Sequence, residues 1–221
     1  GKPFAFDPRT ELGKAITAAE SEVGGGKLTL RRWRAGTSSE VTVKLPVLGS
    51  YSATAPYECP KSQRILELGC KTLAARMEEP SYTKGHDLDP IPRSLNALAL
   101  LASGDPSYRS LVAREAQWAA DFSTGSMQTW YYGYVMMFLA EYVMATGDTA
   151  VVPGLRRLAM EAAEGQSAVG SWGHGFAKPD GRLGGYGMMN SPGLPLTIAL
   201  VMARQAGVDD PAIAKAIERS A

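Results

Sequence analysis

The chain has 221 residues, of which 45% are hydrophobic, and 23 lysines and arginines against 22 aspartates and glutamates leave a formal net charge of +1. A chain of this length can bury its own core, and its charge balance argues against attraction to nucleic acid or an anionic membrane. No apolar run approaches the roughly 20 residues of a membrane span, and the first residues do not read as a signal peptide. A leader removed before Gly1 would place the protein in the periplasm or outside the cell, so localisation stays open.

The first expected elements are one helix and two short strands. Asp7 followed by Pro8 is typical of a helix start, and apolar residues then recur at helical spacing through residues 7–23. Alternating apolar and polar residues in "KLTLRRW" and "EVTVKL" predict two strands joined by a turn at "AGTSS". A helix and a single hairpin enclose too small a core, so other chain must cover them.

The segment "FDPRTELGKAITAAESEVGGGKLTLRRWRAGTSSEVTVKL" resembles the second half of a PDZ-type domain, its groove helix followed by its closing strands. We therefore interpret residues 1–46 as a partial PDZ-like α+β segment. In that family a peptide adds a strand to the sheet and its carboxylate sits in a glycine-containing loop, and both elements would precede Gly1. The resemblance implies a protein contact through this segment but gives no ground for peptide capture. An ordinary α/β cap packed on the following helices is the alternative.

Residues 47–60 read as a linker, because they are rich in Pro, Ser, Thr and Tyr and lack periodicity. Residues 61–221 then repeat one plan, in which an apolar helix ends at a glycine and an aspartate begins a second, more charged helix. Gly104 and Gly147 stand about 43 residues apart, a spacing typical of helical-hairpin repeats. The glycines are expected in the left-handed conformation and the aspartates as N-caps. These residues are Gly104, Gly147 and Gly207, with Asp105, Asp148 and either Asp209 or Asp210.

In each hairpin one helix is apolar nearly all round and the other carries charges on one face. The first kind is expected to be buried on every side and the second to face water. Stacked hairpins of this type form either an open solenoid or a ring with an inner and an outer layer of helices. The fold class predicted is therefore mainly α.

A second resemblance favours the ring. "QSAVGSW", with Gln166, Gly170 and Trp172, is similar to the repeat motif of squalene-cyclase and prenyltransferase-like α/α toroids, although the upstream aromatic residue is missing. In that family the glutamine and tryptophan tie an outer helix to the adjoining loop, which implies a bracing role here. Together with the PDZ-like half, residues 61–221 resemble a bacterial family of unknown function that joins the two modules. The resemblance implies no activity.

The reactive motifs of that superfamily are incomplete in this chain. Its class II cyclases protonate an alkene with Asp-x-Asp-Asp, but "HDLDP" offers only Asp87 and Asp89 before Pro90, so Asp89 is expected to cap a helix. Asp87 stays a catalytic candidate. Its zinc prenyltransferases use Asp, Cys and His, for which the candidates in this chain are His86, Asp87, Cys59, Cys70 and His174, without close spacing. We expect no metal and no cofactor. Cys59 and Cys70 are either an unlinked buried pair or a disulfide.

The glycine-rich segment from Ser171 to Asn190 is the remaining candidate site. Glycines flank His174, and aromatic walls with a few polar groups are typical of a pocket for a glycan, a peptide or a hydrophobic ligand. Aromatic residues at helical spacing are also typical of a buried core, and glycines of tight turns. The catalytic candidates are His174 and Asp180, besides Asp87. The ligand-binding candidates are Trp130, Tyr131, Tyr132, Trp172, Tyr186 and Asn190.

Two functional hypotheses follow from these residues. The first is a binding or scaffolding module, because no catalytic set is complete. The second is a hydrolase or lyase that acts in the toroid cavity through His174 and nearby acids. They differ in whether His174, Asp180, Tyr186 and Asn190 meet in one cavity.

Overall fold

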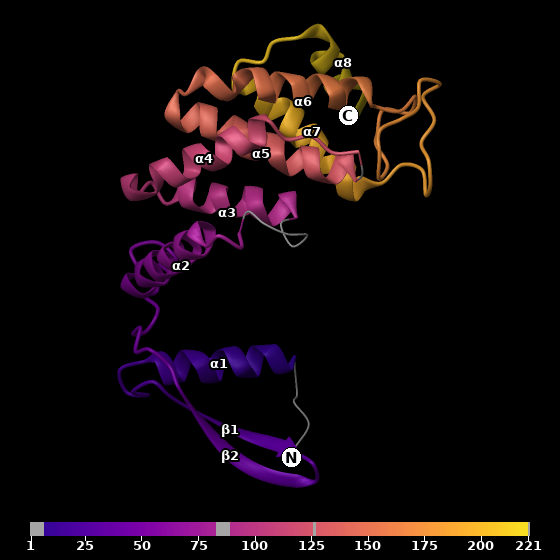
Figure 1. Cartoon of the computed structure of the whole chain (residues 1–221). Coiled ribbons are helices and arrows are strands. Elements are labelled where there is room, and N and C mark those ends of the chain that lie inside the picture. The colour runs from indigo at the N-terminus through magenta and orange to yellow at the C-terminus, as the bar shows by residue number, and fades with distance from the viewer. Residues whose placement is uncertain (1–6, 83–88, 126, 221) are drawn as a thin grey trace. The chain divides into compact units, whose positions relative to one another are not determined.

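The computed structural model describes residues 7–82, 89–125 and 127–220 and is mainly helical, as predicted (Figure 1). The chain divides into two compact units, residues 1–71 and 72–221. No helix in the described ranges is both long and apolar enough to cross a membrane. The elements are α1 (Pro8–Glu20), β1 (Lys27–Arg34), β2 (Thr37–Lys44), α2 (Pro60–Glu78), α3 (Pro90–Ala102), η1 (Pro106–Tyr108), α4 (Arg109–Ala120), α5 (Gln128–Thr146), η2 (Thr149–Val151), α6 (Val152–Glu164), α7 (Asn190–Gln205) and α8 (Pro211–Ser220).

In the first unit, α1 packs against the hairpin of β1 and β2. The Asp7 carboxylate caps α1 by accepting a hydrogen bond from the Arg9 backbone N–H at 2.9 Å. Leu28 is buried under the helix, but Leu30 further along the same face stays 37% exposed. The helix therefore covers only part of the apolar face of the hairpin.

The strands are longer than their sequence pattern indicated. Only Ala35 and Gly36 separate β1 from β2, and both have positive φ. A two-residue turn of this kind suits the right-handed twist of paired strands, so the ladder continues up to the turn. Thr37 to Ser39, which we predicted to be turn residues, therefore pair with β1.

The first turn of α2 is fastened to the end of α1. The Lys61 ammonium group is fully buried and lies 2.7 Å from a carboxylate oxygen of Glu20. It also lies 4.5 Å from the ring centre of Tyr51, where a cation and an aromatic face attract each other. Cys59 and Cys70 are both free and buried, which confirms the unlinked pair and excludes the disulfide.

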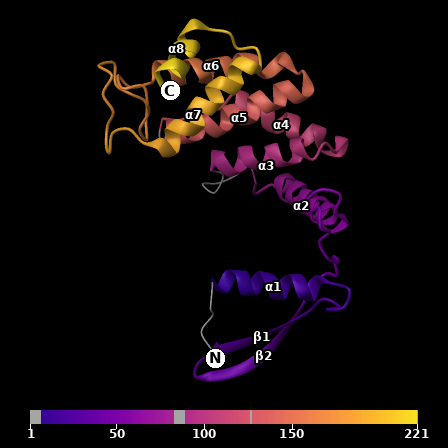
Figure 2. The same cartoon turned by 180° about the vertical axis from the view of Figure 1, so that it is seen from behind.

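The second unit consists of the end of α2 and three helical hairpins, α3–α4, α5–α6 and α7–α8. Helix α5 packs between α3 and α7, and α6 packs against both α4 and α8 (Figures 1 and 2). Helix α5 is apolar nearly all round and contributes more buried residues than any other described helix, whereas α4, α6 and α8 carry charges on an outer face. The hairpins thus form an apolar row (α3, α5, α7) and a more charged row (α4, α6, α8).

The turns inside the hairpins have the predicted chemistry. Gly104, Gly147 and Gly207 all have positive φ, which only glycine adopts without strain. The aspartate that follows each of them accepts a backbone hydrogen bond at the start of the next helix, and Asp210 rather than Asp209 does so in the third hairpin. Asp89 caps α3 in the same way. The caps are therefore confirmed.

The Gln166 motif joins α6 to the loop and to α8. The Gln166 side-chain amide donates to the carbonyls of Gly170 at 2.9 Å and Ala216 at 2.8 Å. The Trp172 indole N–H donates to the Ala162 carbonyl at 2.9 Å, and the ring is fully buried. These bonds anchor the base of the long loop that Figures 1 and 2 show beyond the ends of α6 and α7.

Candidate functional site

Thr129, in the first turn of α5, holds the candidate loop in place. Its fully buried hydroxyl lies 2.6 Å from the carbonyl oxygen of Gly173 and 2.8 Å from that of His174. A threonine hydroxyl has one hydrogen to donate, so the two carbonyls share it. Position 174 is consequently fixed against the start of α5.

Trp130 orients the His174 imidazole. Its indole N–H donates to Nδ1 of His174 at 2.9 Å, and the two rings stack with centroids 5.9 Å apart and planes inclined by 25°. Because an indole N–H can only donate, Nδ1 must be the acceptor, and the neutral ring carries its hydrogen on Nε2. Among the contacts of the described residues none uses Nε2–H, which is therefore available as a hydrogen-bond donor.

Tyr186 completes an exposed group of rings. It packs edge to face on His174 with centroids 6.0 Å apart, and the residue is 88% exposed. Trp130 and His174 are half-buried. We call Trp130, His174 and Tyr186 the aromatic platform.

The other predicted binding residues do not belong to this platform. Trp172 and Tyr132 are buried, Tyr131 is half-buried against Phe122, and Asn190 is exposed at the first residue of α7. Tyr132 donates a hydrogen bond to Glu161 at 2.5 Å. Burial, and next the bond to Glu161, raise the pKa of Tyr132 to about 12, so its phenol stays protonated.

Asp180 occupies a tight turn, and the contacts found for its side chain among the described residues are with Arg182 in that turn. The Gly181 N–H donates to the Lys178 carbonyl at 2.8 Å, and the exposed Asp180 carboxylate accepts from the Arg182 N–H at 3.0 Å. The sequence "KPDG" is typical of such a turn, so this signal predicts a turn position for Asp180. Asp87, the third catalytic candidate, and His86 lie outside the described residues.

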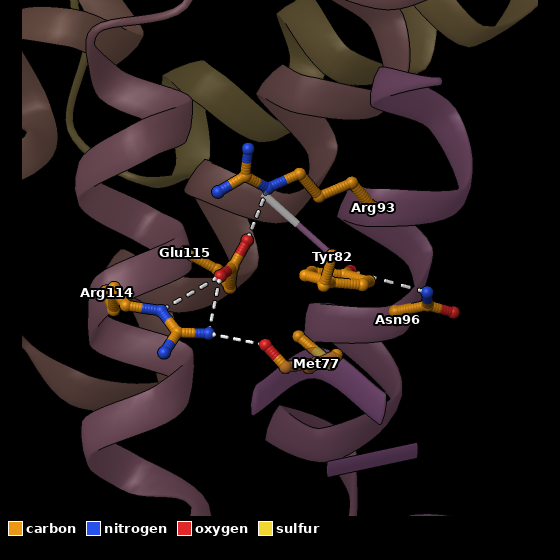
Figure 3. A network of polar contacts seen from close by, with 6 residues as sticks. All are labelled: Met77, Tyr82, Arg93, Asn96, Arg114 and Glu115. Carbon is orange, nitrogen blue, oxygen red and sulfur yellow. Dashed lines mark hydrogen bonds and ion pairs between the residues drawn. The ribbon is translucent and has the colours of Figure 1, made fainter. Parts of the chain in front are cut away.

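Sequence reasoning missed a buried ionic network in the second unit (Figure 3). The Glu115 carboxylate on α4 is fully buried and lies 2.5 Å from Nε of Arg93 on α3 and 3.2 Å from Arg114. Arg114 also donates to the Met77 carbonyl at 2.9 Å, and the Arg93 guanidinium stacks 3.8 Å from the ring centre of Trp118. One carboxylate thus links the end of α2 to α3 and α4.

A signal for this network does exist in the sequence. Glu115 stands four residues from both Leu111 and Ala119, on the face of α4 that is buried. A carboxylate on the apolar face of a helix requires a partner, since an unpaired buried charge is costly. Which arginine supplies the partner depends on how the helices pack.

Cys59 lies directly before α2 and lines a cavity of about 500 Å³. The Ser52 backbone N–H points at its sulfur at 3.4 Å. Hydrogen bonding from Ser52, and next from Ser62 in the first turn of α2, lowers the pKa of the thiol to about 6, because these donors stabilise the thiolate. Cys59 is therefore mostly ionised at neutral pH.

We expect the alkylation rate of Cys59 by iodoacetamide to follow a titration with its midpoint near pH 6 in the folded chain. In urea the midpoint should rise to about 8.5, the ordinary value for a free cysteine. Because the folded pKa is the lower one, ionisation stabilises the fold above the unfolded pKa, and this stability is lost as the pH falls through about 6. The Cys70→Ala variant isolates the signal, and a folded midpoint at or above 8 contradicts the assignment.

No group of three or more histidine, cysteine, aspartate or glutamate residues suited to a metal ion occurs within residues 7–82, 89–125 and 127–220. A family model described as a domain of unknown function (DUF6288) matches residues 62–221, which is more than half of the chain. No curated protein and no solved structure matches the chain.

Proposed function

We propose that this chain, which belongs to the DUF6288 family of domains of unknown function, is a binding module whose aromatic platform contacts a glycan. The observation that carries the proposal is the hydrogen bond from Trp130 to Nδ1 of His174. It leaves Nε2 as the nitrogen that carries the hydrogen, in a ring that also contacts the exposed ring of Tyr186.

A sugar ring matches this surface better than the other ligand classes considered. It presents a face of C–H groups that packs on an aromatic ring and hydroxyls at its edge that accept or donate hydrogen bonds. The platform offers Tyr186 as the ring and His174 as the edge donor, and its three members carry no carboxylate or ammonium group. A purely hydrophobic ligand would leave the imidazole N–H without an acceptor.

The catalytic alternative lacks a comparable contact. Among the described residues, the contacts found for Asp180 are with Arg182 in its own turn, and those for His174 are with Trp130, Thr129 and Tyr186. General acid or base chemistry needs a carboxylate within hydrogen-bond reach of the reacting group or of the histidine. The geometry therefore favours binding.

We also propose that the three hairpins are part of an α/α toroid and that residues 1–46 are a partial PDZ-like segment. The separation into an apolar and a more charged row of helices supports the first assignment. The packing of α1 on the hairpin, with apolar residues of one hairpin face left exposed, supports the second and a protein contact there.

We expect at least one member of a panel of gluco-, chito-, manno- and xylo-oligosaccharides to bind the full chain in calorimetric titrations. Tyr186→Ala should weaken that binding about 2- to 12-fold, because one aromatic contact contributes roughly 0.5–1.5 kcal/mol. Trp130→Phe, which removes the N–H that orients His174, should weaken it similarly.

Met188→Ala is the matched control, since Met188 is 61% exposed in the same loop but carries no ring. Its affinity should equal that of the unmodified chain. The proposal is rejected if no oligosaccharide binds, or if Tyr186→Ala and Met188→Ala bind equally well.

A further inference from the structure

A small cavity of about 210 Å³ opens beside the Glu115 network. At about 30 Å³ per water molecule it has room for roughly seven waters, which is below the usual size of a pocket for a drug-sized ligand. Its polar lining comes from the end of α2, the segment after it and the first turns of α3. These residues are Arg76, Glu79, Ser81, Tyr82, Arg93 and Asn96. We propose that this cavity binds a small oxyanion such as phosphate.

Among the described residues, the charges at and behind the cavity wall leave an excess of positive charge. Glu115 is the only carboxylate that Arg93 and Arg114 contact among the described residues, so one negative charge faces two positive ones. Arg76 adds a third cation and Glu79 a second carboxylate at the cavity wall. The charged side chains at the wall, Arg76, Glu79 and Arg93, sum to +1, and the Arg114–Glu115 pair behind them sums to zero. A monoanion would neutralise this charge.

Arg93 is already oriented for such a ligand. Its side chain is only 11% exposed, and its Nε is bonded to Glu115 (Figure 3). Its guanidinium group lies 3.8 Å from the ring centre of Trp118. In the described part of the chain, the hydrogen bonds found for this side chain use Nε, which leaves its two terminal nitrogens as donors. A guanidinium fixed in this way loses little entropy when it binds an oxyanion.

Tyr82 supplies an independent observation. The residue is 7% exposed, lines the cavity, and accepts a hydrogen bond from the Asn96 side-chain amide at 3.4 Å (Figure 3). Asn96 is the partner found for this hydroxyl among the described contacts, and there the hydroxyl accepts, so its hydrogen can be donated to a molecule in the cavity. Burial raises the pKa of Tyr82, which keeps the phenol protonated as a donor. An oxyanion in the cavity would provide a charged acceptor for it.

The test is a calorimetric titration of the full chain with inorganic phosphate at constant ionic strength, with chloride as the reference anion. We expect saturable binding of phosphate. Arg76→Gln should weaken it roughly 10- to 100-fold and Tyr82→Phe about two- to tenfold, as expected for a charged and a neutral donor. Arg76 is exposed, so its variant should fold normally, which a thermal melt verifies.

Arg109→Gln is the matched control, because Arg109 is an exposed arginine on α4 that does not line this cavity. It should bind phosphate like the unmodified chain. Absence of saturable binding, or equal affinities for Arg76→Gln and Arg109→Gln, would overturn the proposal. Tyr186 belongs to the aromatic platform and does not line this cavity, so Tyr186→Ala should bind phosphate like the unmodified chain. The phosphate titration and the oligosaccharide titration can therefore fail independently of each other.

Discussion

Replacing Glu115 by glutamine is expected to lower the free energy of unfolding of the second unit by about 3–5 kcal/mol. The carboxylate is fully buried, and its removal leaves Arg93, only 11% exposed, without its counter-charge. A buried charge that loses its partner keeps the cost of its desolvation, which is why breaking such a pair costs more than the pair itself contributes. Urea unfolding followed by circular dichroism measures the loss.

Two further variants separate this effect from a general loss of charge. Glu218→Gln removes an exposed carboxylate from α8 and should change stability by no more than about 0.5 kcal/mol. The double variant Arg93→Met, Glu115→Leu removes both buried charges and should regain much of the lost stability. If the free energy of unfolding of the Glu115→Gln chain is less than about 1 kcal/mol below that of the unmodified chain, the network is not a structural link between these helices.

Replacing Trp172 by alanine should cost about 3–5 kcal/mol in the same assay. The fully buried ring fills the space between the loop and α6, and its N–H satisfies the Ala162 carbonyl at 2.9 Å. The variant loses the packing of the ring and leaves that carbonyl unsatisfied. Trp172→Phe keeps part of the packing and should cost less.

Trp33→Ala serves as the comparison, because Trp33 on β1 is 70% exposed. This substitution should change the free energy of unfolding by about 0.5 kcal/mol or less. Equal stabilities of the Trp172→Ala and Trp33→Ala chains would contradict the bracing role of the motif. Trp172→Ala can also be titrated with the oligosaccharide under conditions in which it is folded. If its free energy of unfolding falls by the expected amount of about 3–5 kcal/mol while its oligosaccharide affinity is unchanged, Trp172 stabilises the loop and does not contact the ligand.

Local sequence signals predicted the elements and their ends well. A glycine that ends one helix is followed directly by an aspartate that caps the next, as in Gly104–Asp105 and Gly147–Asp148. These signals act over two residues and do not depend on the rest of the fold. The hairpin was less well predicted, because Ala35 adopts a positive φ that its residue type disfavours.

The candidate site was only partly predictable, because its contacts join residues far apart in the chain. His174 and Tyr186 were proposed from composition, but the bond between Trp130 and His174 spans 44 residues and depends on Thr129 holding the loop. Arg93 and Glu115 are 22 residues apart on different helices. Burial on the α4 face indicates that Glu115 needs a partner, whereas the identity of that partner follows from helix packing.

The most direct test of the proposed function is the state of the His174 imidazole. Proton–nitrogen correlation spectra of the histidine side chains, assigned with a His86→Gln variant, identify the tautomer of His174, since the chain has only two histidines. We predict a neutral ring with its hydrogen on Nε2, and a shift of the Nε2 signal when the bound oligosaccharide is added. A hydrogen on Nδ1, or an Nε2 signal that is unchanged at saturating ligand, would contradict the account.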